Sequence, residues 1–166
     1  MRSKPSHPAG FAALAAVGLA LASCSPSGPP GVDRAKLDEE VSRAIGDPAT
    51  CVLIGKKGSG KLLYRYNSAT TCGRTLPACD RPERITLTDL LDATAKDGRP
   101  RRLSCDTAPD HSKGVGWASG PIEGTDWVYA AVMEGNRVFP GLMMADRLDG
   151  AFRRAGVSKP AQAPSS

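Results

Sequence analysis

Histidines and long apolar runs are both scarce in this sequence of 166 residues. Its two histidines, His7 and His111, leave little room for histidine-based catalysis or for zinc sites, which need several nitrogen or sulfur ligands. The main apolar stretch, residues 11–22, is shorter than the ~20 residues of a membrane-spanning helix. The charge excess is also small, with 22 basic and 17 acidic side chains. Because nucleic-acid-binding proteins concentrate Lys and Arg on one face, nucleic acid is not an expected partner.

The first 24 residues have the layout of an export signal followed by a lipidation site. Arg2 and Lys4 supply positive charge, residues 11–22 form the apolar zone, and small residues precede Cys24. The sequence Leu-Ala-Ser-Cys at 21–24 resembles the lipobox of bacterial lipoproteins. The resemblance implies cleavage before Cys24, a diacylglyceryl group on its thiol, and palmitate-type chains in a lipid bilayer. The alternative is an ordinary signal peptide whose cleavage site contains a cysteine.

These features predict four parts in the chain. Residues 1–23 are expected to be a cleaved signal peptide, and residues 24–32, rich in Pro, Gly and Ser, a lipidated flexible tether. Residues 33–157 are expected to form one domain, because this length suits a single core. Residues 158–166 contain few apolar side chains and are expected to be disordered. The product would be anchored in the cell membrane or the outer membrane and would face the periplasm or the exterior.

The spacing of apolar residues predicts an α+β domain. Helices are expected after Asp33, over residues 87–97, where Thr86 and Asp89 form a capping-box pattern, and around a stripe that begins at Met144. The order helix, two strands, helix, three strands, helix favours an antiparallel sheet of about five strands with helices packed on its faces. Residues 67–84 are expected to be an irregular loop. The predicted strands are residues 51–54, 62–66, 101–105, 115–119 and 127–133.

Apart from Cys24, the sequence has an even number of cysteines in a chain that its leader directs to an oxidising compartment. Two disulfides are therefore expected among Cys51, Cys72, Cys79 and Cys105, and four cysteines allow three pairings. The first hairpin would bring Cys51 near Cys72, and the helix after Cys79 would run back toward Cys105, so these pairs are favoured. A zinc site or redox pair would need Cys-x-x-Cys spacing or a nearby histidine. No metal and no cofactor are expected.

Residues 55–61 (GKKGSGK) follow an apolar strand and match the phosphate-binding loop G-x-x-x-x-G-K. Leu62 stands where that motif has the Ser or Thr that holds magnesium, and the residues beyond are strand-like where the motif needs a helix N-terminus. These residues are therefore expected to form a hairpin turn, and no nucleotide is expected to bind.

Because His7 lies in the leader, histidine catalysis would have to use His111, whose neighbours are Asp110 and Ser112. Residues adjacent in sequence rarely point at one another as a nucleophile, a base and an orienting acid must. Metal binding by His111 with Asp106 and Asp110 lacks a recognised spacing. His111 is interpreted as a solvated loop residue, and no catalytic residue is assigned.

The element order and residues 60–67 (GKLLYRYN) resemble the sheet-and-helix part of the penicillin-binding and serine β-lactamase families. In those families an N-terminal helix and hairpin precede a helical insert, and three strands and a last helix follow. This sequence has no Ser-x-x-Lys on a helix after the hairpin, no Ser-Asp-Asn, and Lys-Gly-Val at 113–115 in place of Lys-Thr-Gly. The resemblance implies a scaffold without the catalytic serine.

Trp117 and Trp127 flank the turn of the second predicted hairpin at nearly equal distances. They could therefore lie near each other across two strands, either as packing in the core or as an exposed aromatic platform for a glycan or a protein. The second alternative makes the pair a candidate binding face.

These features lead to the hypothesis of a non-catalytic lipoprotein that binds another component of the cell envelope. The alternatives are a cell-wall hydrolase that uses His111 or a serine, and an inhibitor of hydrolases.

Overall fold

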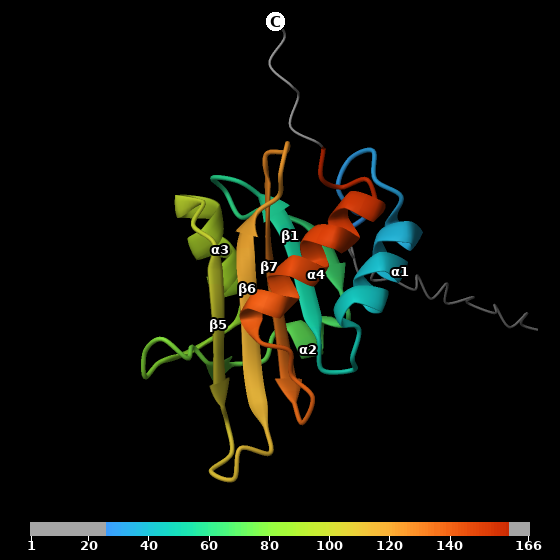
Figure 1. Cartoon of the computed structure of the whole chain (residues 1–166). Helices are drawn as coiled ribbons and strands as arrows, with labels where there is room; N and C mark the ends of the chain where they lie inside the picture. The colour runs from blue at the N-terminus through green and yellow to red at the C-terminus, as the bar shows by residue number, and fades with distance from the viewer. Residues whose placement is uncertain (1–25, 160–166) are drawn as a thin grey trace, which may run out of the picture.

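The computed structural model describes residues 26–159, in which a five-stranded antiparallel sheet forms the centre of the fold (Figure 1). The spatial order of its strands is β2-β1-β7-β6-β5, so β2 and β5 are the two edges. A separate two-stranded sheet pairs β3, Leu76–Pro77, with β4, Arg84–Ile85. The strands of the main sheet are β1 Cys51–Lys56, β2 Leu62–Tyr66, β5 Arg101–Asp106, β6 Gly114–Pro121 and β7 Trp127–Gly135.

The position of each strand follows from its apolar pattern. In β1 the first five residues are all buried, and β6 and β7 each contain an uninterrupted buried run. A strand covered by helices on both faces needs such a continuous run, which places these three in the centre. By contrast, exposed and half-buried residues alternate along β5, as expected for an edge strand with a partly solvated surface.

Helices cover both faces of the sheet (Figure 1). On one side, here called the α1/α4 face, α1, Arg34–Ile45, packs against α4, Gly141–Arg154, and the ring of Phe152 meets Tyr129 edge-on at 5.3 Å. On the other side, the α3 face, α3, Leu87–Asp97, packs on β7 and β1. Each face has its own apolar cluster, so the sheet separates two layers of core.

The predicted α+β class, sheet and helix order are confirmed, and α3 has the predicted bounds. The prediction of an irregular loop over residues 67–84 is wrong in part. That segment contains the short helix α2, Ala69–Cys72, and both strands of the small sheet. Elements of four or two residues are too short to show a periodic pattern of apolar side chains, so the sequence does not predict them.

The segment before α1 lies on the domain, so the prediction of a flexible tether at residues 24–32 is wrong for residues 26–32. Pro29 is buried, Val32 packs against the core of the α1/α4 face, and the Gly28 amide donates to the carbonyl oxygen of Leu63 at 3.0 Å. Proline has an apolar ring and little backbone freedom to lose, so a Pro-rich segment orders at low entropic cost. Residues 24 and 25 lie outside the described residues.

The predicted disordered tail also begins later than expected. The amide of Ser158 donates to Phe152 at 3.3 Å, and the amide of Lys159 donates to Glu123 at 3.0 Å. The folded domain therefore includes both residues, while residues 160–166 and the predicted leader, 1–23, lie outside the described range. No helix within residues 26–159 is long and apolar enough to cross a membrane.

The start of α3 offers a test of the capping box. The Thr86 hydroxyl accepts from the Asp89 amide at 3.2 Å, and the Asp89 carboxylate accepts from the Thr86 amide at 2.8 Å. Replacement of Thr86 by alanine is expected to lower the free energy of unfolding by about 1 kcal/mol, because one helix N–H loses its partner. Urea denaturation measures the change. Thr88→Ala, at an exposed position of the same turn, should be nearly neutral, and an equal loss in both variants would contradict the assignment.

Candidate functional site

The candidate catalytic residues do not form a triad. His111 lies in the β5–β6 loop with a side chain that is 77% exposed, and its Nδ1 bonds to the Asp106 carboxylate. The Ser112 hydroxyl donates instead to Asp110 at 2.7 Å, and this bond lowers the pKa of the Asp110 carboxyl. No hydrogen bond joins Ser112 to His111 within the described residues. The loop thus holds two separate polar pairs, as expected for solvated residues.

Residues 55–61 form the connection between β1 and β2, as predicted from Leu62 and the strand-like residues beyond it. Gly58 and Gly60 have φ values of +83° and +67°, which suit a tight turn of glycine-rich chain. A strand follows the turn, so there is no helix N-terminus to face a phosphate.

Of the two alternatives for Trp117 and Trp127, the exposed aromatic platform is not the one observed, and both rings pack against the core. Trp117 is fully buried, lies opposite Val132 of β7, and donates its indole N–H to the carbonyl oxygen of Pro77 at 2.8 Å. Trp127 is half-buried and packs against the core of the α1/α4 face, whereas Trp117 belongs to the core of the α3 face. The two rings therefore lie on opposite faces of the sheet.

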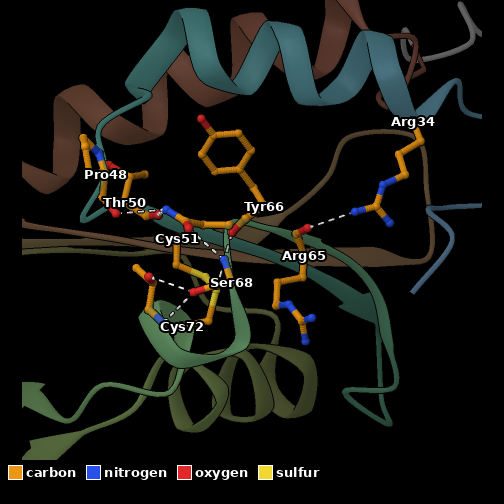
Figure 2. The surroundings of a disulfide bond; sticks show 10 residues. Arg34, Pro48, Thr50, Cys51, Arg65, Tyr66, Ser68 and Cys72 are labelled. Atoms are coloured by element: carbon orange, nitrogen blue, oxygen red, sulfur yellow. Dashed lines mark hydrogen bonds between the residues drawn. A yellow bond between two sulfur atoms is a disulfide. The ribbon is translucent and has the colours of Figure 1, made fainter. Parts of the chain in front are cut away.

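Both favoured disulfide pairs are present. Cys51 of β1 is joined to Cys72 of α2, and Cys79 is joined to Cys105 of β5. Figure 2 shows how the first bridge holds α2 beneath the start of β1. Cys51 and Cys72 are 0% and 6% exposed, whereas Cys79 and Cys105 are half-buried. The second bridge ties the loop that carries the small sheet to an edge of the main sheet.

The β2 edge of the main sheet is occupied by the segment that leads into α1. The Arg34 guanidinium donates to the carbonyl oxygen of Arg65 at 3.5 Å, as Figure 2 shows, and also to the carbonyl oxygen of Pro26. Together with the bond from Gly28 to Leu63, these contacts satisfy backbone groups on the outer side of β2. Such coverage protects an edge strand from pairing with another chain.

The β5 edge has no hydrogen-bonded cover of this kind, although the Cys79–Cys105 disulfide attaches the loop of the small sheet to it. β5 pairs with β6, and within residues 26–159 no other hydrogen bond involves a backbone group of β5. Its residues Arg102, Ser104 and Asp106 are exposed. An antiparallel edge strand carries outward-facing N–H and C=O groups that can pair with an added strand. Of the two sheet edges, β5 is thus the one open to an extended polypeptide.

An apolar surface adjoins this open edge. Ser104 of β5 accepts the first amide of α4, from Gly141, at 2.8 Å, which brings the start of that helix against the strand. The next two side chains, Leu142 and Met143, are 59% and 42% exposed, the large apolar side chains most open to solvent in the described part of the chain. A pocket of about 310 Å³ lies between β5, the start of β6 and the residues that lead into α4. It is lined by Ser104, Cys105, Asp106, Gly114, Val115, Val138, Phe139 and Pro140.

Gly141 is required for this close approach. A Cβ atom there would lie 2.2 Å from the carbonyl oxygen of Trp117 and 2.6 Å from the amide nitrogen of Leu103. Any larger residue would push α4 away from β5 and β6. The glycine therefore fixes Leu142 and Met143 next to the open edge.

Sequence reasoning missed this surface. The stripe that begins at Met144 correctly predicted the buried side of α4, where Met144 is 0% exposed. Leu142 and Met143 precede that stripe and fall on the solvent side of the helix. Two large apolar residues outside a well-defined buried stripe were the available signal.

Among residues 26–159, no group of three or more His, Cys, Asp or Glu side chains is arranged to hold a metal ion. Comparison with known proteins finds no matching family model, no matching curated protein and no matching solved structure. The resemblances to the lipobox and to the penicillin-binding and serine β-lactamase families therefore stay predictions.

Proposed function

We propose that this protein is a lipid-anchored extracytoplasmic binding module that takes up an extended segment of an envelope protein along β5. The observation that carries the proposal is the open β5 edge beside the exposed side chains of Leu142 and Met143. A non-catalytic role agrees with the separate polar pairs in the loop of His111.

Strand addition explains why one edge is covered and the other is open. An extended polypeptide that pairs with an exposed edge gains main-chain hydrogen bonds, and pockets for alternate side chains supply specificity. The pocket lined by Val138, Phe139 and Pro140 borders Ser104 and Asp106, whose side chains lie on the same face of β5. An apolar side chain of the bound segment would fill this pocket.

The charge of Arg102 favours a partner segment with an acidic residue. Arg102 is exposed and forms no salt bridge with any residue from 26 to 159. A segment with Asp or Glu opposite Arg102 would gain a favourable cross-strand pair.

Two independent features support an extracytoplasmic location. The first 24 residues carry the lipobox pattern. The two disulfides join four cysteines of the domain, as is common in proteins that fold in an oxidising compartment. An acylated Cys24 would hold the module on the membrane whose neighbouring proteins it binds.

The test places a photo-crosslinking residue at Met143 of the full-length protein in living cells. A discrete protein adduct is expected, and Leu142→Asp or Arg102→Glu in the same chain should reduce it several-fold, since each alters an exposed contact of the proposed edge. A crosslinker at Ala35, exposed on α1, is the matched control and should give no such adduct.

Thermal melts would verify that Leu142→Asp and Arg102→Glu fold normally, as expected for exposed positions. Equal adducts from Met143 and Ala35, or an adduct insensitive to both substitutions, would rule out the β5 edge as the binding site.

A further inference from the structure

We infer that the β2 edge lies against the phospholipid headgroups of the bilayer, so that the open β5 edge points away from the membrane. The inference rests on the proposed function, because it takes Cys24 to be the acylated residue. It adds an orientation, which anchorage alone does not imply.

The connection between anchor and domain is short. Only Ser25 separates Cys24 from Pro26, the first described residue. Two residues of fully extended chain span at most about 7 Å. Acyl chains on Cys24 therefore hold Pro26 close to the membrane surface.

Pro26 is in turn fastened to the β2 edge. Arg34 donates one hydrogen bond to the carbonyl oxygen of Pro26 and another to that of Arg65 in β2. A single guanidinium therefore joins these two segments of the polypeptide. The bond from the Gly28 amide to Leu63 adds a second point of attachment two residues further on. Pro29, buried just beyond, keeps the segment from swinging away. The bilayer must then meet the domain near β2.

The side chains near this contact suit a phosphate-rich surface. Lys61 is exposed immediately before β2, and the half-buried Arg65 lies within it. Neither forms a salt bridge with an acidic residue in the described range, 26–159. Basic side chains beside a membrane are attracted to lipid headgroups, which would reinforce the orientation set by the anchor.

The sheet then separates the membrane from the proposed binding edge. Because β2 and β5 are opposite edges of a five-stranded sheet, four strand spacings lie between them, or about 19 Å. A partner segment could reach β5 without displacing lipid.

Two measurements on the acylated protein test the orientation. Vesicles of phosphatidylethanolamine and phosphatidylglycerol are floated to report anchorage. The floated protein is then treated with a membrane-impermeant amine-reactive reagent, and mass spectrometry follows Lys61 beside β2 and Lys113 near the far edge. In the structure of the domain, which includes no membrane, both lysine side chains are exposed to solvent. We expect Lys61 to react several-fold more slowly than Lys113.

The matched control is the same acylated chain with about ten Gly and Ser residues inserted between Ser25 and Pro26, a linker with a reach of roughly 18 Å. This variant should float equally well but lose the difference between the two lysines, because the longer connection lets the domain turn.

The outcomes separate the orientation from the anchor. A protein that floats but shows equal reaction at Lys61 and Lys113 overturns the orientation and leaves the lipid anchor intact. Protection of Lys61 that persists in the insertion variant supports the orientation but assigns it to the attraction of Lys61 and Arg65 to the headgroups and not to the short connection. A protein that does not float refutes the anchor, and the orientation with it.

Discussion

Replacement of Cys24 by serine is expected to release the protein from the membrane almost completely. Serine has no thiol to receive a diacylglyceryl group, so the chain would lose its acyl chains. A single chain binds a bilayer only marginally, but each buried CH₂ contributes roughly 0.8 kcal/mol, and two or three chains hold a protein in place. The described domain has no helix that could span a membrane in their place.

The measurement is flotation of cell membranes, combined with metabolic labelling by a clickable fatty acid and intact-mass analysis. Wild type should float and carry acyl mass, whereas Cys24→Ser should do neither. Ser27→Ala, an exposed change three residues further on, should behave as wild type. An unmodified thiol at Cys24 in the native protein, or an uncleaved leader, would refute lipid anchorage.

The fold could be predicted where signals are local and repeated. The Asp33 side chain accepts from the amides of Ala35 and Lys36, as an N-cap should, and the predicted capping box of α3 is present. Gly98, at φ +67°, ends α3 in the left-handed conformation that glycine favours. Each of these features depends on residues within one turn, so no knowledge of tertiary packing was needed.

The alternative in which Trp117 and Trp127 lie side by side depended on strand register. The strand was expected to end at residue 119, which placed the centre of the turn near residue 123. In the structure β6 continues to Pro121, and Trp117 is paired with Val132. Trp127 lies an odd number of residues from Val132, and side chains alternate between faces along a strand. A shift in register by an odd number of residues moves a side chain to the other face of the sheet.

The candidate site could not be predicted from composition because it depends on which backbone groups lack partners. Pro and Gly at residues 26–31 indicate a linker, yet Gly28 fills part of one sheet edge. Residues 101–105 were predicted as a strand, but nothing in their pattern indicates that β5 is an edge whose outer backbone groups stay unpaired within residues 26–159. The roles of both segments follow from the spatial order of the strands, which the pattern of apolar residues along the sequence does not specify.

Removal of the buried disulfide by Cys51→Ala with Cys72→Ala is expected to destabilise the domain strongly. The bridge closes a loop with a sequence separation of 21, and loop-closure entropy of that size contributes about 3 kcal/mol. Urea denaturation should show this loss, and thermal melts a fall of roughly 10 °C for a domain of this length.

The second disulfide supplies a matched control. Cys79 and Cys105 have a sequence separation of 26, so chain entropy predicts almost the same loss for their double alanine variant. Cys51 and Cys72 are almost fully buried, and their removal also takes apolar contacts from the core between β1 and α2, whereas the half-buried Cys79–Cys105 pair loses fewer. The Cys51–Cys72 variant should therefore be the less stable of the two. The reverse order would mean that fixing the Cys79 loop to the β5 edge contributes more to folding than burial does.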